Sequence, residues 1–171
     1  MMKISPLLLA ATLLASAAPV MAGNFTSRLV GVWKAEGLVR QQGFGDEEKV
    51  RCRMVGRSVD DVQVNLEGKC ATSRGAAKFK LFVAQDKSGK TFAALARLST
   101  KKELVSLAGK RVGDVVTLTA KEPLQQGSRA LSSTLTLTVP QAGDIKMTNV
   151  LTDAQSGDKA QSLTLTLIRK K

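Results

Sequence analysis

The chain of 171 residues contains no histidine, no tyrosine and a single tryptophan. Without histidine it lacks the usual general base of Ser-His and Cys-His sites, and also the commonest side-chain ligand of metal ions. No nucleophile, base and orienting group can be assembled from the residues that remain, and no phosphate-binding or calcium-binding loop motif is present. We therefore expect a protein that is not an enzyme, and we predict no metal site and no cofactor.

The scarcity of aromatic residues also argues against a membrane barrel. Such a barrel carries an apolar outer band flanked by girdles of aromatic side chains. Here one side of most alternating segments is Lys, Arg, Gln or Thr. After residue 22 no segment is apolar enough to cross a bilayer as a helix. We expect no transmembrane segment in the mature protein.

The amino-terminal residues have the pattern of a secretory signal peptide. A basic start with Lys3 is followed by an apolar run from Pro6 to Pro19, and small or aliphatic residues precede a cleavage site after Ala22. The apolar run is shorter than the roughly 20 residues that a membrane-spanning helix needs. We predict that residues 1–22 are removed and that residues 23–171 form a single β domain, located in the periplasm or secreted.

The charge balance is strongly basic. Lysine and arginine number 26 against 14 aspartates and glutamates, for a formal net charge of +12. An exported protein meets few nucleic acids, so we predict no nucleic-acid partner. Its expected counterparts are anionic lipid, lipopolysaccharide or an acidic protein. The alternative is that the charge serves only solubility.

Alternation of apolar and polar residues with a period of two dominates the chain, for example over 62–70, 77–83, 134–139 and 163–167. This pattern is typical of half-buried strands. Glycine-containing turn sequences separate the runs. The segment from Phe92 to Leu107 is ambiguous, and we favour two short strands over helical turns. The sequence predicts an all-β fold, a single antiparallel up-and-down barrel of about 8–10 strands, with a β-sandwich as the alternative.

The two cysteines predict one disulfide, because an even number in an exported chain favours pairing. A hairpin that turns near residues 58–61 places Cys52 directly opposite Cys70. The bridge would stabilise the fold by about 3 kcal/mol in the chain-entropy model. A reactive thiol is the alternative, since flanking cations lower a thiol pKa. On a strand, however, Arg51 and Arg53 point away from Cys52.

The same hairpin and the next run of residues carry a candidate anion-binding face. Period-two geometry directs their cations to one outer side, and an arginine in the connection joins them. A solvated outer face without function is the alternative. The candidate residues are Lys49, Arg51, Arg53, Lys69, Arg74, Lys78 and Lys80.

Gly31 and Trp33, two positions apart near the start of the domain, resemble the G-x-W element of lipocalin-type barrels. That resemblance implies that Trp33 closes one barrel end beneath a basic residue of the last strand, here Arg169. The alternative is a core tryptophan of any β fold. Together with Val50-Arg51-Cys52-Arg53, Cys70-Ala71 and the repeated Gly-Asp turns, the layout also resembles a family of small exported proteobacterial proteins of unknown function.

We therefore expect an exported non-catalytic binding protein. It would hold an apolar or lipid-like ligand inside the barrel, or dock its basic face on anionic envelope components. The inward positions are mostly Leu, Val, Ala and Gly, and small lining residues favour a cavity. The alternative is a structural, adaptor or inhibitor protein of the envelope without a small ligand.

Overall fold

The computed structural model describes residues 24–40, 44–99 and 104–170, and the predicted signal peptide lies outside these residues. Within them, one short helix precedes eleven strands. The bounds are α1 Phe25–Arg28, β1 Gly31–Arg40, β2 Glu47–Asp60, β3 Gln63–Thr72, β4 Gly75–Gln85, β5 Thr91–Leu98, β6 Val105–Val112, β7 Val115–Ala120, β8 Leu124–Gln126, β9 Arg129–Thr138, β10 Ile145–Asp153 and β11 Lys159–Arg169.

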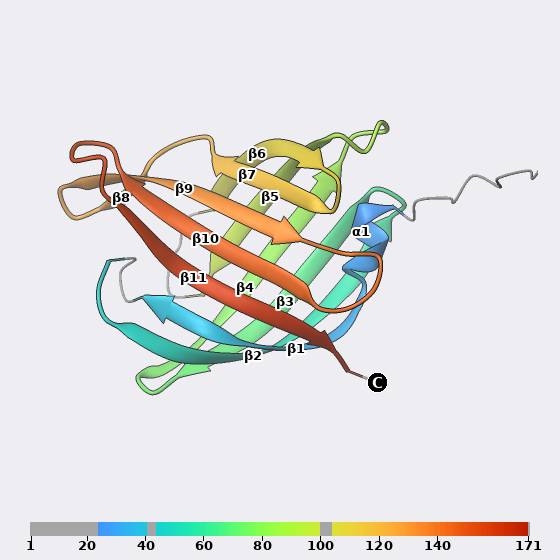
Figure 1. The fold of residues 1–171 in the computed structure, drawn as a ribbon, viewed down its shortest axis with the longest axis horizontal. Coiled ribbons are helices and arrows are strands. Elements are labelled where there is room, and N and C mark those ends of the chain that lie inside the picture. The colour runs from blue at the N-terminus through green and yellow to red at the C-terminus, as the bar shows by residue number, and fades with distance from the viewer. Residues whose placement is uncertain (1–23, 41–43, 100–103, 171) are drawn as a thin grey trace, which may run out of the picture.

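Ten of these strands form a closed antiparallel barrel (Figure 1). The chain runs as a meander from β1 to β7 and continues through β9 to β11, and β11 pairs with β1 to close the ring. The short β8 pairs with the first residues of β9, beside the stretch of β9 that pairs with β7. The predicted up-and-down barrel is confirmed and the sandwich alternative is wrong, because the closed pairing leaves no pair of separate sheets.

The ambiguous segment forms strands, as predicted. Phe92 lies on β5 and Leu107 on β6, and the two strands pair antiparallel. On other strands too, the alternation of apolar and polar residues along the sequence corresponds to the alternation of buried and less buried side chains. On β9, Leu135 and Leu137 are buried while Thr134 and Thr136 are only partly covered. Each buried leucine contributes about 1.5–3 kcal/mol through removal of its side chain from water.

Two glycines allow the sheet to coil tightly enough to close. A Cβ atom on Gly37 of β1 would collide with the main-chain oxygen of Thr164 on β11. A Cβ atom on Gly109 of β6 would collide in the same way with Thr117 on β7. Glycine inside a strand often marks such a close approach of backbones at a barrel bend. Neighbouring strands can therefore cross closely at these two positions.

Candidate functional site

The predicted disulfide joins β2 and β3. Cys52 and Cys70 are bonded to each other and are directly opposed in the antiparallel register. Arg53 lies opposite Lys69 on the other face, and both side chains are exposed. Because the sulfur atoms are bonded on the inner face and the cations lie on the outer face, this segment carries a structural bridge and no reactive thiol.

Gly31, Trp33 and Arg169 lie together at one end of the barrel. Trp33 is buried and is directly opposed to Arg169 across the β1–β11 pair. The guanidinium carbon of Arg169 lies 4.4 Å from the centroid of the indole ring. The same group donates hydrogen bonds to the main-chain oxygens of Val30 and Arg28, at 3.0 and 3.2 Å. A Cβ atom on Gly31 would lie 2.6 Å from a guanidinium nitrogen of Arg169, so glycine leaves room for the stack.

Helix α1 fills the interior at this end. The ring of Phe25 is fully buried and packs edge-to-face on Phe92, with ring centroids 5.1 Å apart. Arg28 forms an ion pair with Asp114 at 2.7 Å and donates a hydrogen bond to the main-chain oxygen of Val139, also at 2.7 Å. These contacts tie α1 to the turn after β6 and to the segment after β9. We call this end, where α1 and the Trp33 stack lie, the closed end.

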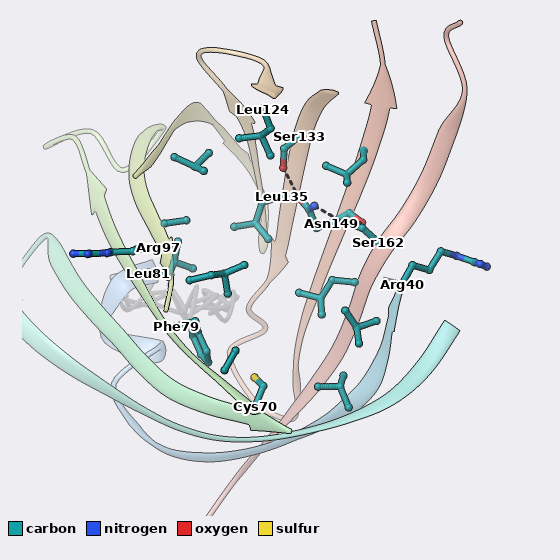
Figure 2. Close-up of a pocket in the computed structure, with 18 of the residues that line it drawn as sticks. Arg40, Cys70, Phe79, Leu81, Arg97, Leu124, Ser133, Leu135, Asn149 and Ser162 are labelled. Carbon is teal, nitrogen blue, oxygen red and sulfur yellow. Dashed lines mark hydrogen bonds between the residues drawn. The ribbon is translucent and has the colours of Figure 1, made fainter. Parts of the chain in front are cut away.

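The other half of the barrel contains a cavity of about 740 Å³ (Figure 2). Every described strand except β7 contributes to its wall. Most lining side chains are apolar, with leucines at the centre. The volume lies within the range of about 300–1,000 Å³ that is typical of small-molecule sites. The leucines are Leu81, Leu98, Leu107, Leu124, Leu131, Leu135, Leu151, Leu163 and Leu165.

The wall contains several polar side chains, Thr72, Gln125 and Gln126 among them. Three others come from adjacent strands and lie together, and we call these three the polar strip (Figure 2). The hydroxyl of Ser133 on β9 donates to Oδ1 of Asn149 on β10 at 2.8 Å. Nδ2 of Asn149 donates to the hydroxyl oxygen of Ser162 on β11, also at 2.8 Å. The Ser162 hydroxyl in turn donates to the main-chain oxygen of Asn149 at 3.1 Å. The three side chains therefore form one connected chain of hydrogen bonds.

Ser162 reaches the cavity because β11 contains a β-bulge. Asn149 pairs with Leu163 and Val150 pairs with Gln161, so Ser162 is the extra residue on β11. Ser162 and its neighbour Leu163 consequently both line the cavity. Bulges redirect side chains and are over-represented next to functional sites.

The arginines that line the cavity do not direct free charge into it. A guanidinium nitrogen of Arg40 lies 3.3 Å from the carboxylate of Glu47, and one of Arg74 lies 2.8 Å from that of Glu48. In Figure 2 the guanidinium groups of Arg40 and Arg97 point away from the interior. Within the described residues, the cavity therefore offers a ligand mainly apolar groups and neutral hydrogen-bonding groups.

The seven cations of the predicted anion-binding face lie on β2, β3, β4 and the turn between β3 and β4. Three of them have carboxylate partners. Arg74 pairs as described above, Arg51 lies 3.7 Å from Glu36, and Lys80 lies 2.9 Å from Glu67. The hydrogen bond from Lys80 is the main reason why the pKa of the Glu67 carboxyl lies below its ordinary value. Each of these three cations therefore has a neighbouring carboxylate that offsets part of its charge.

Three of the other four predicted cations, Arg53, Lys69 and Lys78, lie in a row across neighbouring strands. Lys34, which the sequence analysis did not include, extends this row. Lys34 on β1 is opposed to Arg53 on β2, Arg53 to Lys69 on β3, and Lys69 to Lys78 on β4. All four are exposed, and none makes an ion pair within the part of the chain that the structure describes. We call them the cationic row. Lys49 is exposed on the same outer face of β2 but lies outside this row.

Sequence reasoning missed Lys34 and the polar strip. Simple alternation around Trp33 already directs Lys34 outward. Ser133 and Asn149 also gave a signal, because each is a polar residue at an inward position of an alternating run. Ser162 gave none, because alternation continued back from the leucines of β11 points it outward, and only the bulge turns it into the cavity.

No protein-family model matches the chain, and a search of curated proteins finds no significant match. The resemblance to an exported proteobacterial family therefore stays a prediction. The structure defines the class of protein through its fold, a closed ten-strand antiparallel barrel that is consistent with a calycin-like barrel. Among the described residues, no helix combines the length and the hydropathy that a membrane crossing requires.

Proposed function

We propose that this protein is a non-catalytic binding protein that holds an apolar or lipid-like molecule in the open half of its barrel. The cavity of about 740 Å³ carries this proposal. Transfer of a ligand's apolar surface from water to the leucine-lined wall gains about 25 cal/mol per Å² buried. Side chains fill the opposite end, so the cavity has a floor and a ligand enters from one side.

We also propose that the protein acts in the periplasm or as a secreted protein. The disulfide supports this location, because such bridges persist in oxidising compartments. The stack of Arg169 on Trp33 behind Gly31 supports a relation to lipocalin-type barrels. Lipocalin barrels have fewer strands than this one, so we propose the relation at the level of calycin-like barrels.

A matched pair of variants on β5, each with one alanine replaced by phenylalanine, tests the binding function. Ala96 lines the cavity, whereas Ala93 is exposed on the outer face of the same strand. The test titrates the protein with Nile red, whose fluorescence rises in an apolar site. We expect the wild type and Ala93→Phe to bind the dye and Ala96→Phe to lose most of the binding. An absence of binding to the wild type, or equal binding to both variants, would refute the proposal and favour a structural, adaptor or inhibitor role.

The cationic row favours a second function, docking on the surface of an anionic lipid layer of the envelope. Neighbouring strands lie roughly 4.8 Å apart, so the four charges form a line across four strands. Ile168, which is opposed to Lys34, and nearby Val32 are exposed apolar residues beside this row. A mixture of cations and exposed apolar side chains suits an interface with both head groups and acyl chains.

Vesicle co-sedimentation tests this docking. We expect binding to vesicles that contain phosphatidylglycerol and none to phosphatidylcholine vesicles, with a decrease as salt is raised. Arg53→Gln combined with Lys69→Gln should abolish the binding. Lys87→Gln combined with Lys90→Gln removes the same charge from the exposed turn between β4 and β5 and should leave it intact. Equal losses in both double variants would indicate attraction by net charge alone, and failure of the wild type to bind would leave an acidic protein as the partner to seek.

A further inference from the structure

We infer that the ligand is a neutral amphiphile whose hydroxyl or amide group binds to the polar strip. This inference rests on the proposed function of the cavity and adds the chemical class of the ligand. An interior made only for hydrocarbon would need no polar group in its wall. Here Ser133, Asn149 and Ser162 lie side by side on β9, β10 and β11 and line the cavity (Figure 2).

The hydrogen bonds within the strip leave a defined set of free donors and acceptors. The Ser162 hydroxyl donates its proton to the main-chain oxygen of Asn149, so its oxygen must accept from Asn149. This fixes the orientation of the Asn149 amide, with Nδ2 toward Ser162 and Oδ1 toward Ser133. Among the described partners, the second N–H of Asn149, a second lone pair on its Oδ1 and lone pairs on both serine oxygens remain for a ligand.

A donor beside acceptors matches groups that both donate and accept. A hydroxyl or a primary amide can accept a hydrogen bond from the second N–H of Asn149 and donate one to a serine oxygen. Ser133 and Ser162 are 5% and 8% exposed, so a ligand that covers the strip without forming hydrogen bonds leaves the second N–H of Asn149 buried without a partner. The strip therefore favours an alcohol or an amide over an alkane of the same length.

The charges around the cavity argue against an anionic head group. The guanidinium groups of Arg40 and Arg97 are directed away from the interior, and Arg74 is engaged by Glu48. Lys80, the remaining cation among the described residues of the wall, is engaged by Glu67 at 2.9 Å. A carboxylate at the strip would lose its hydration and gain no cation in return. A fatty acid is then expected to bind in its protonated form, so its apparent affinity should rise as the pH falls toward the pKa of its carboxyl group.

Competition among ligands of equal chain length tests the inference. Dodecanol, dodecanamide, dodecanoate and dodecane each compete with bound Nile red at a pH well above the carboxylate pKa. We expect the alcohol and the amide to compete at concentrations roughly tenfold lower than the other two, as one well-placed buried hydrogen bond implies. The apparent affinity of dodecanoate should approach that of dodecanol as the pH is lowered.

Asn149→Leu removes the central amide and keeps the branched shape of the side chain. It should still bind Nile red and lose the preference for dodecanol over dodecane. Thr166→Val, on the outer face of β11, removes one hydroxyl away from the cavity and should retain the preference. Asn149→Ala removes the same amide without adding a branched apolar side chain, and it carries the test if Asn149→Leu does not fold.

The outcomes separate this inference from the proposed function. No binding of Nile red to the wild type overturns both. Binding with equal competition by all four ligands overturns the inference and leaves the carrier function standing. A preference that survives in Asn149→Leu, or in Asn149→Ala if that variant has to carry the test, also overturns it, because the strip then only stabilises the bulge of β11.

Discussion

Replacing Arg53 by threonine should stabilise the protein, although it removes a charged surface residue. Arg53 lies between two cations on neighbouring strands, Lys34 and Lys69, at directly opposed positions. Like charges directly opposed in a sheet destabilise it, by an amount on the scale of about 0.2–1 kcal/mol per cross-strand pair. Arg53→Thr relieves two such contacts and introduces a good strand former. We expect the free energy of unfolding to rise by about 1 kcal/mol at low ionic strength.

Arg51→Thr is the matched control. Arg51 lies on the same outer face of β2, two positions from Arg53, but it is opposed to Glu36 on β1 and Ala71 on β3, and its guanidinium nitrogen is 3.7 Å from the carboxylate of Glu36. Both substitutions remove one positive charge and introduce the same residue. Loss of an exposed ion pair should lower the free energy of unfolding by roughly 0.2–1 kcal/mol. The two variants are therefore expected to differ in sign, which a change in net charge alone does not produce.

Urea unfolding at two ionic strengths measures both effects. Screening extends over about 30 Å at 0.01 M salt and about 8 Å at 0.15 M, so the gain of Arg53→Thr should shrink as salt is added. The slope of the free energy of unfolding against urea concentration should be the same in the wild type and both variants, since the fold is unchanged. A loss of stability in Arg53→Thr, or a gain that is independent of salt, would refute the assignment of these residues as a repulsive row.

Three further predictions follow from the described contacts. Replacing Cys52 and Cys70 together by alanine should lower the free energy of unfolding by about 3 kcal/mol, as measured by urea unfolding; a loss below about 1 kcal/mol would contradict a bridge that acts through chain entropy. Lys80→Met should raise the pKa of Glu67 toward its ordinary value of 4.5, measurable by NMR titration of the carboxyl carbon. Because the pKa of Glu67 is lowered in the folded protein, its contribution to stability is present above the unfolded pKa and is lost as the pH falls through the folded pKa. Acid unfolding should therefore be steeper in the wild type than in Lys80→Met, and identical pH profiles would contradict the pair. Arg169→Ala should lower the free energy of unfolding by about 2 kcal/mol, since it removes a cation–π contact and two charge-assisted hydrogen bonds, and it should increase the solvent quenching of the tryptophan fluorescence; unchanged fluorescence would count against the closed end.

Local alternation made the strands and the disulfide predictable. A strand directs successive side chains to opposite faces, so polar and apolar residues along each run separated outside from inside without reference to other strands. The same rule placed Cys52 and Cys70 on one face and Arg51 and Arg53 on the other. A turn near residues 58–61 then sufficed to oppose the cysteines, because hairpin register depends on nearby residues alone.

The candidate site was only partly predictable, because it depends on contacts between distant segments. The sequence pointed to a cavity through its small inward residues, and to a basic outer face. It did not distinguish Lys80, which a carboxylate neutralises, from Lys78, which joins the cationic row. That difference depends on the register of β3 against β4, in which Glu67 is opposed to Lys80 and Lys69 to Lys78.

By itself, the sequence determined the strand segments, the face that each side chain occupies and the pairing of the cysteines, because these follow from the two-residue period of an extended chain. Only the tertiary structure decided that β11 closes on β1, that α1 fills one end, and that a cavity remains at the other. The bulge that turns Ser162 toward Asn149 belongs to the same level, since it exists only where β10 and β11 pair out of step. These features arise from barrel closure and strand register, which depend on many weak long-range contacts acting together.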